Sequence, residues 1–582
     1  MRDWIVYPIW AVVAAGLLSA QPADKEKDIV LKAMKDELAR SRSLRVIGEP
    51  PYYIEYTLDD AEMFYVSASY GGVLQERNNR LRQPRVRIRV GEAKLDNSNH
   101  ISSDAFRGSR YDPGQFAIED NYDVLRMGFW LATDRAYKQG LEALARKKAS
   151  LKNINVSDTL PDFSAAPPVS LFLPVGRKPA DASAWRARVK EISAVFSGYE
   201  QVLSNDANVG VSQTVTYFIN SEGSEFRMPD NLSTFRIRAA GLGSDGLPVR
   251  DYAEFLAVDA ARLPGTAESI QAATRVAENI KAMATAPSLE SYSGPVLFED
   301  SAGGQIMAEL IARNLSILRR PITDPDRPLN LPQGELEGRL GSRVLPEWLD
   351  VVDDPTQKEW RGIPLLGYYP VDMEGVVPKA LPLVEKGVLK AYYTTRQPIQ
   401  GVETSNGHAR LPGILGNNSA LAANLFVKSS QPAAVAELRK RLLEIGKQRS
   451  KPFVIVVRKM DFPSTASLAE LRSIGGGQQG RAISRPLMIY KLFPDGREEL
   501  IRGVRFRGFN VRSLKDIVAA SDDLYVFHYL ENGAPFAHMD AGGYVAGTSV
   551  VAPALLFDDL ELEKIPGELP KPPVVPPPPL NK

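Results

Sequence analysis

The hydrophobic positions of this chain follow two different periods, and the period changes along the sequence. Apolar residues recur at roughly helical spacing through residues 25–42, so this segment predicts an amphipathic helix. The stretches that follow cluster β-branched and aromatic residues, and Asp-Asp and Gly-Gly pairs separate them. We therefore expect strands at residues 52–58, 63–70 and 84–90, with turns at Asp59-Asp60 and Gly71-Gly72.

Helical and strand-like patterns continue to interleave further along the chain. Segments with few helix breakers predict helices at residues 122–148, 181–203, 264–284, 302–318 and 433–445. Strands are expected at residues 214–220, 234–240 and 453–457. Strands of antiparallel type between helices predict an α+β fold with mixed or antiparallel sheets.

The length of 582 residues is several times that of a usual domain, so several domains are expected. A proline-rich stretch at residues 160–168 is predicted as a linker, and the last stretch, mostly proline, favours a disordered tail. The predicted division is a signal peptide at residues 1–20, an N-terminal α+β domain at 21–160, a middle α+β domain at 161–290, a C-terminal domain at 291–565 and the tail at 566–582.

The first residues have the form of a secretory signal peptide. Residues 5–18 are apolar, and Ser19 and Ala20 supply the small residues of a cleavage site. A membrane-spanning helix needs about 20 apolar residues, whereas this run is shorter and contains Pro8. The sequence therefore predicts cleavage after Ala20, an extracytoplasmic location (periplasmic or secreted), and no membrane anchor in the mature chain.

Composition excludes several kinds of chemistry. The 71 basic and 70 acidic side chains nearly balance, which argues against nucleic acid as the partner. There is no cysteine in the sequence, so it offers no disulfide, no thiolate metal ligand and no cysteine nucleophile. The G-x-S-x-G, Walker A and H-E-x-x-H motifs are also missing from the sequence.

Histidine, another common zinc ligand, occurs four times, at His100, His408, His528 and His538. No two of them have the one-turn spacing that places two imidazoles on one helix face. His528 and His538 flank a turn-like segment and could face each other across a hairpin beside Asp540, although the simpler interpretation is that both are ordinary strand residues. The sequence predicts no metal ion or other cofactor in this chain itself.

A series of short motifs runs through the C-terminal half. In chain order they are V-L-F-E-D-S-A-G-G at 296–304, V-V-D-D-P-T at 351–356, D-M-E-G-V at 372–376, L-V-E-K-G-V-L-K at 383–390, T-R at 395–396 and S-N-G-H-A-R at 405–410. This order resembles the TldD/PmbA family of peptidase-like proteins, and N-S-E-G at 220–223 is similar to a turn in the family's middle domain. The resemblance implies a multi-domain TldD/PmbA-like architecture.

The resemblance also implies a zinc peptidase site, which this sequence does not complete. Active members of the family carry H-E-x-x-x-H on the helix after the A-G step, and a cysteine near the C-terminal end. In this chain the histidine positions fall on Met307 and Ala312, and the glutamate position falls on Ala308. Thioether and methyl groups cannot replace imidazole and thiolate as zinc ligands. The chain therefore resembles the family type that lacks the zinc motif.

In this family a metal-free chain associates with a zinc-bearing relative and helps to shape the substrate channel. The resemblance thus implies a subunit of a heterodimer that binds peptide or unfolded polypeptide, and the predicted signal peptide implies that this subunit is exported. The candidates for lining a substrate groove are Arg396, Ser405, Asn406 and His408, whose alternative role is to satisfy local turn geometry.

Two other interpretations stay open at this point. One is an independently active peptidase or other hydrolase that uses His408, or the group of His528, His538 and Asp540. The other is a non-enzymatic binding or assembly protein that keeps only the fold and uses the proline-rich tail as a docking element.

Overall fold

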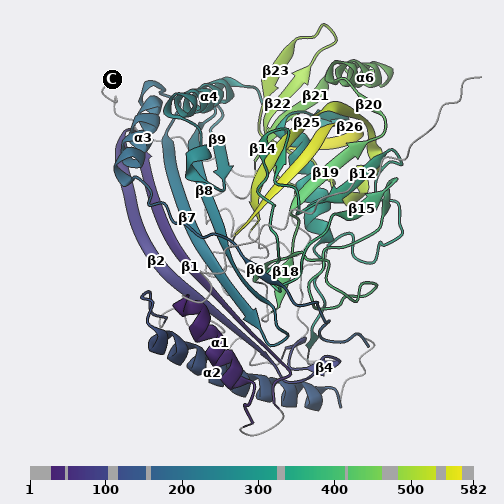
Figure 1. The fold of residues 1–582 in the computed structure, drawn as a ribbon. Coiled ribbons are helices and arrows are strands. Elements are labelled where there is room, and N and C mark those ends of the chain that lie inside the picture. The colour runs from purple at the N-terminus through teal and green to yellow at the C-terminus, as the bar shows by residue number, and fades with distance from the viewer. Residues whose placement is uncertain are drawn as a thin grey trace, which may run out of the picture.

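The computed structural model describes residues 28–45, 50–101, 116–152, 159–323, 334–412, 417–461, 483–531 and 545–565. Two large sheets dominate the molecule, a long curved sheet from the N-terminal half and a mixed sheet from the C-terminal half (Figure 1). This arrangement confirms the predicted α+β class with mixed and antiparallel sheets. The predicted signal peptide and the predicted proline-rich tail lie outside the described residues.

The N-terminal sheet has the strand order β2-β1-β7-β8-β6, and β9 also pairs with β8. Its strands are β1 (Tyr53–Ser69), β2 (Gly72–Arg89), β6 (Ser170–Phe172), β7 (Ser204–Asn220), β8 (Glu225–Leu242) and β9 (Pro248–Ala257). β1 and β7 pair antiparallel over almost their full length. The predicted boundary between domains 21–160 and 161–290 therefore does not fall between two sheets, because strands from both sides of it share this one.

The turn predicted at Asp59-Asp60 is wrong, because β1 runs straight through both residues. The Asp59 carboxylate accepts a hydrogen bond from the Thr216 hydroxyl at 2.7 Å and pairs with Arg85 at 3.2 Å. Asp60 pairs with Arg82 on β2 at 2.9 Å. Ion pairs with the neighbouring strands thus keep two poor strand formers inside a strand, which local propensity does not reveal.

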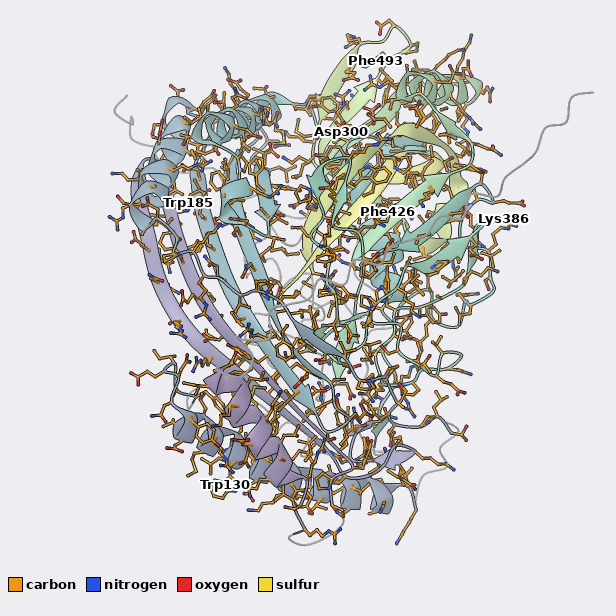
Figure 2. All side chains as sticks on the ribbon, viewed as in Figure 1. Trp130, Trp185, Asp300, Lys386, Phe426 and Phe493 are labelled. Carbon is orange, nitrogen blue, oxygen red and sulfur yellow. The ribbon has the colours of Figure 1, made fainter. Side chains whose placement is uncertain are left out.

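Two pairs of helices cover the same face of this sheet. They are α1 (Ile29–Ser41), α2 (Tyr122–Ser150), α3 (Ala182–Ala194) and α4 (Thr266–Thr285). On β1, Ile54 and Tyr56 join the core under α1 and α2, while Phe64 and Val66 join the core under α3 and α4. These even-numbered positions point to one face of the strand. Figure 2 shows Trp130 and Trp185 near the two ends of the sheet, where the two helix pairs lie.

The C-terminal sheet has the order β16-β15-β12-β19-β26-β10-β21-β22-β23, with β24 and β25 on β26 and β20 on β25. Its strands are β10 (Ser291–Phe298), β12 (Leu349–Asp353), β15 (Leu381–Glu385), β16 (Val388–Leu389), β19 (Asn424–Ser429), β20 (Pro432–Ala433), β21 (Val454–Met460), β22 (Pro486–Leu492), β23 (Glu498–Ile501), β24 (Val504–Arg507), β25 (Ile517–Glu531) and β26 (Ala546–Lys564). The sheet is mixed, since β10 is parallel to β21 and antiparallel to β26.

Short elements complete the described chain. The remaining strands are β3 (Gly91–Glu92), β4 (Leu95–Asp96), β5 (His100–Ile101), β11 (Ile322–Thr323), β13 (Glu359–Trp360), β14 (Ile363–Pro364), β17 (Ala409–Pro412) and β18 (Asn418–Ala420). The helices of this half are α5 (Ser301–Met307) and α6 (Val435–Gln448). Within the described ranges, every helix is too short or too polar to cross a membrane.

The connection from β10 to α5 holds a strained residue. Asp300 has φ 49° and ψ −130°, and the Ala302 amide donates to the Glu299 carbonyl at 3.0 Å. These values are those of the first central residue of a type II′ turn, a position that favours glycine. The side chain of Asp300 makes no capping hydrogen bond to α5. The turn therefore stores backbone strain of about 1 to 3 kcal/mol.

We expect Asp300→Gly to raise the free energy of unfolding by about 1 kcal/mol, because glycine adopts this conformation without a Cβ clash. The midpoint of urea denaturation should increase accordingly. Asp300→Ala is the matched control, since it removes the carboxylate but keeps the Cβ atom and the strain. Equal shifts for the two variants would show that charge, and not backbone strain, is responsible.

Candidate functional site

The helix that should carry the metal motif changes its winding midway. α5 leads into a π-helical turn, Ala308–Ala312, and then a 3₁₀ turn, Arg313–Leu315. The Arg313 amide donates to the Ala308 carbonyl, five residues earlier. A π turn brings residues five apart onto one helix face, so Met307 and Ala312 share a face. The side-chain amide of Asn314 donates to the backbone carbonyls of Glu309 and Leu310 at 3.3 and 3.1 Å.

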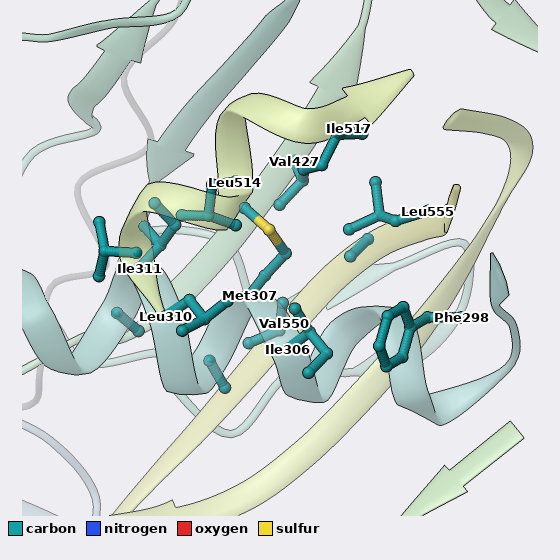
Figure 3. Packing of buried hydrophobic residues seen from close by; sticks show 14 of the residues in the cluster. Phe298, Ile306, Met307, Leu310, Ile311, Val427, Leu514, Ile517, Val550 and Leu555 are labelled. Carbon is teal, nitrogen blue, oxygen red and sulfur yellow. The ribbon is translucent and has the colours of Figure 1, made fainter. Parts of the chain in front are cut away.

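The three positions of the expected metal motif lie inside the hydrophobic core. Met307 and Ala308 are fully buried, and Ala312 is 1% exposed. Figure 3 shows the Met307 thioether among Leu514, Ile517 and other apolar side chains of the same cluster. The side chains at these three positions offer no imidazole or carboxylate to a metal ion. It is instead the packing face between the helix and the C-terminal sheet.

The carboxylate nearest to the motif is already occupied. Glu309 is only 6% exposed. Its carboxylate accepts a hydrogen bond from the Gln305 side-chain amide at 2.9 Å and another from the Ser484 backbone amide at 2.8 Å. Across the described ranges, no group of three or more His, Asp or Glu side chains has the placement of a metal site.

Arg396 joins the C-terminal half to the N-terminal sheet. Its side chain is 1% exposed and pairs with Glu222 through Nη1 at 2.7 Å. Nη2 donates to the same carboxylate at 2.8 Å, and Nε donates to the Ser164 carbonyl at 2.9 Å. The Ser164 amide in turn donates to the Arg396 carbonyl at 2.8 Å. Three segments far apart in the sequence thus meet at one guanidinium group.

Aromatic rings complete this junction. The Phe163 ring lies between two guanidinium groups, those of Arg396 and Arg89, each 4.0 Å from the ring centre. The Tyr53 ring packs against Phe163 at 4.8 Å. Cation–π contacts of this kind are strongest when water is excluded. The segment predicted as a linker at residues 160–168 is therefore partly buried and holds the two halves together.

The S-N-G-H-A-R segment folds against the residues before Arg396. The Asn406 side chain accepts from the Thr394 amide at 3.0 Å and donates to the Tyr392 carbonyl at 2.8 Å. The Ser405 hydroxyl accepts from the Gly407 amide at 3.1 Å. These bonds account for the local polar groups of the loop, so the turn-geometry interpretation applies at least to Ser405 and Asn406.

His408 is fully buried and belongs to a polar cluster. Its Nε2 atom is 3.5 Å from Asp353 Oδ1, and its Nδ1 atom is 3.1 Å from Asn406 Oδ1. Asp353 also accepts from the Tyr393 hydroxyl at 3.0 Å and from the Ala423 amide at 2.9 Å. Burial and the Asp353 charge hold the pKa of Tyr393 well above its usual value. The cluster links four segments of the C-terminal half.

The D-M-E-G motif supplies two more buried carboxylates. Asp372 accepts from the backbone amides of Glu374 and Val376 at 2.9 Å and of Ala409 at 3.1 Å. Burial and the charge of Glu374 raise the pKa of Asp372 to about 8, and the three amides only partly offset this. Glu374 itself accepts from the Arg396 amide and from Asn418. The motif therefore connects the S-N-G-H-A-R segment to the Arg396 junction.

The structure thus brings all four predicted groove residues into one region, but on the inside of the protein. Arg396 and His408 are buried, whereas Ser405 and Asn406 are partly buried. Their role in binding a peptide stays a prediction. Sequence reasoning missed their partners, namely Phe163, Ser164, Tyr393 and the pairing of Glu222. Of these partners, only Tyr393 lies close in sequence to a quoted motif, two residues before Thr395.

The second histidine group is described only in part. His528 lies on β25 opposite Ser549 on β26, and its Nδ1 atom is 2.9 Å from the Ser549 hydroxyl. Ser549 accepts from the Leu366 amide at 2.8 Å, so its proton is free to point to His528. Burial lowers the pKa of His528 to about 4. His538 and Asp540 lie outside the described residues.

Comparisons with known proteins agree on one relationship. Residues 290–446 match the family model of the PmbA/TldA metallopeptidase C-terminal domain. A protein from Archaeoglobus fulgidus named metalloprotease is 35% identical over 79 residues, which is 14% of this chain and 17% of that relative. TldE from Thermococcus kodakarensis has a TM-score of 0.54 and 12% identity, covering 91% of this chain and 99% of its own. A proposed modulator of DNA gyrase from Thermotoga maritima has a TM-score of 0.56 and 15% identity, with the same coverage.

The chain therefore has the multi-domain fold of these solved structures and is a metallopeptidase-like protein. Residues 290–446 are similar to the C-terminal domain of the TldD/PmbA family, which confirms the resemblance of the motifs in this part of the chain.

We expect Arg396→Met to lower the free energy of unfolding by about 3 kcal/mol, because it leaves a buried carbonyl and a carboxylate without their donor. Chemical denaturation of Arg396→Met and of the parent chain measures this loss of stability. The matched control is Arg343→Met, whose side chain is 50% exposed and lies 3.9 Å from Glu347. A loss in the control as large as in Arg396→Met would contradict the assignment of Arg396 as the junction.

The lowered pKa of His528 predicts a loss of stability in acid. Between pH 6.5 and about 4 the unfolded imidazole binds a proton that the folded one does not. The free energy of unfolding should therefore fall by about 2 kcal/mol for this group between pH 7 and pH 5. His528→Gln removes this titration, so its urea midpoint should fall less over the same range. Equal pH dependence in both proteins would refute the prediction.

Proposed function

We propose that this chain is an exported, zinc-free subunit of the TldD/PmbA family that shapes a peptide-binding channel together with a zinc-bearing relative. The observation that carries the proposal is that the motif helix combines a π turn with apolar side chains at the expected histidine positions. The π turn that aligns residues five apart is present, while Met307 and Ala312 occupy the aligned positions.

The composition of the chain supports a zinc-free role. The motif helix lies far from any histidine in sequence, because none occurs between His100 and His408. The sequence also has no cysteine that could complete a zinc site. Imidazole and thiolate provide most of the affinity of zinc sites in proteins. A relative with the complete motif would have to supply the metal and its bound water.

The rigidity of the Arg396 region supports a channel-shaping role. The S-N-G-H-A-R segment is fixed from one side by the Asp353 cluster and from the other by the Arg396 junction. A polar segment held in this way can present backbone and side-chain groups to an extended peptide without losing conformational entropy on binding. The apolar run and small residues at positions 5–20 support export.

Metal content and activity test the proposal directly. The purified chain should contain substoichiometric zinc by mass spectrometry and should not cleave unfolded peptides alone. Addition of a TldD/PmbA relative that carries H-E-x-x-x-H should give cleavage above that of the relative by itself. A relative with both motif histidines changed to alanine is the control and should give none.

Other outcomes would support other functions. One tightly held zinc per chain would refute the proposal. Cleavage by the isolated chain that is lost in His408→Ala or His538→Ala would establish an independent peptidase instead. Binding of a partner without any effect on its cleavage rate would favour a non-enzymatic assembly protein.

A further inference from the structure

The N-terminal sheet has one face under its four helices and a second face without helices. On β8, Phe235 and Ile237 belong to the core under α3 and α4. Successive residues of a strand point to opposite faces, and β8 pairs with β7 without any shift of register. Phe226, Met228 and Asp230 therefore point to the second face. We refer to this second face as the inner face of the sheet.

The inner face contacts the C-terminal half at two places. Near the start of β8, Phe226 belongs to a small apolar cluster with Val371. Towards the end of β8, Tyr252 on β9 lies opposite Arg238 and donates a hydrogen bond to the Met460 carbonyl at 2.9 Å. A strand rises about 3.3 Å per residue, so the two contacts are about 40 Å apart along β8. Inner-face residues between them are half-buried or exposed.

Asp230 lies between these two contacts and carries an uncompensated charge. Its side chain is exposed, so water reaches the carboxylate. Burial and the charge of Asp59 nevertheless raise the pKa of Asp230, and the charges of Arg410 and Arg85 only partly offset this. A carboxylate that is open to water but surrounded by protein lies in a recess. Within the described ranges, this carboxylate has no hydrogen bond and no ion pair.

The cation that faces Asp230 from the C-terminal half is Arg410, which is already held by neutral groups. Its Nη1 atom donates to the Ala422 carbonyl and to the Thr548 hydroxyl, the latter at 3.1 Å. Its Nη2 atom donates to the Gly547 carbonyl at 2.7 Å. Arg410 therefore acts on Asp230 across the recess and does not pair with it. The recess is left with one negative group that can accept a hydrogen bond from a ligand.

The surroundings of Asp230 suit a long side chain with a charged end. Met228 and Leu232 lie two residues to either side of it, point to the same face and are half-buried. Thr214 on β7 lies directly opposite Asp230 and is also half-buried. Lysine and arginine side chains place an apolar stem along such a surface while the charged end stays in a polar environment.

We propose that Asp230 binds a cationic group of a peptide substrate, with Met228 and Leu232 in contact with the stem of a lysine or arginine side chain. The inference rests on the peptide-binding role proposed above and adds a substrate preference to it. The preferred peptide carries a basic residue, whose nitrogen donates to the Asp230 carboxylate. Such charge-assisted hydrogen bonds are stronger than neutral ones.

Binding of fluorescently labelled peptides to the full chain tests the proposal. One unstructured peptide is acetylated and amidated at its ends and contains a single lysine among neutral residues, and a second has glutamine in place of the lysine. Fluorescence anisotropy gives the two dissociation constants. We expect the parent chain to bind the lysine peptide about tenfold more tightly, as for one hydrogen bond to a charged group.

Two variants show whether Asp230 causes this preference. Asp230→Asn should bind both peptides equally, with the affinity for the glutamine peptide unchanged. Asp522→Asn is the matched control, because Asp522 is an exposed aspartate on β25, and it should keep the preference of the parent chain. Asp230→Lys should prefer a third peptide with glutamate at the same position, a result that a purely structural role of Asp230 would not give.

A further peptide identifies the source of the cation. It has the glutamine sequence and a free amino terminus. Binding as tight as that of the lysine peptide, and lost in Asp230→Asn, would support the proposal with the amino terminus as the bound group. Binding as weak as that of the acetylated glutamine peptide would support the basic side chain.

Two results would overturn the inference. One is equal affinity of the parent chain for the lysine peptide and both glutamine peptides. The other is an equal loss of affinity for all peptides in Asp230→Asn, since Asp230 would then act on the fold and not on charge. Far-ultraviolet circular dichroism of the variants measures such a change of fold directly.

The subunit role can fail or hold independently of this site. If the chain still increases cleavage of the glutamine peptide by a relative that carries H-E-x-x-x-H, the subunit role stands even when the charge preference is absent. A charge preference without any increase in cleavage would refute the subunit role and retain the cationic site at Asp230.

Discussion

The contacts of the buried Arg396 guanidinium group hold the N-terminal and C-terminal halves of the protein together. A guanidinium carries its donors in a fixed plane, and here they are divided between Glu222 and the Ser164 carbonyl, with the Phe163 ring on its face. A buried charge that lacks such partners costs several kcal/mol. The three segments must therefore be in place together, and each has little stability at this position without the others.

Other arginines repeat this arrangement along the boundary between the halves. Arg319 donates to the carbonyls of Leu160 and Pro161 at 2.9 and 2.6 Å, and Arg502 donates to the Ala286 carbonyl at 2.9 Å. Each of these carbonyls belongs to irregular backbone outside the helices and strands. Side-chain donors thus take the place of a shared sheet, because backbone oxygens buried at a domain boundary must still be paired.

The helices and strands were predictable where the hydrophobic residues of a segment followed either the helical or the strand period clearly. Residues 122–148 and 264–284 were expected to be helical, and α2 and α4 match them within a few residues. The strand through Asp59 and Asp60 was not predictable, since Thr216, Arg85 and Arg82 stabilise it from other strands. The candidate site shows the same limit. The residue types of the site were visible in S-N-G-H-A-R. However, the burial of His408 depends on its contact with Asp353. The burial of Arg396 depends on residues more than 170 positions away in the sequence.

The motif helix keeps its change of winding with apolar side chains at Met307 and Ala312. Histidines at positions 307 and 312 without a metal would leave imidazole nitrogens buried without partners, which is unfavourable. Methionine is flexible enough to fill the same space with dispersion contacts inside the apolar cluster to which Met307 belongs. The π turn needs no metal, because Asn314 donates to the two carbonyls that the change of winding leaves available. Packing and one side-chain amide therefore maintain this change of winding in the helix.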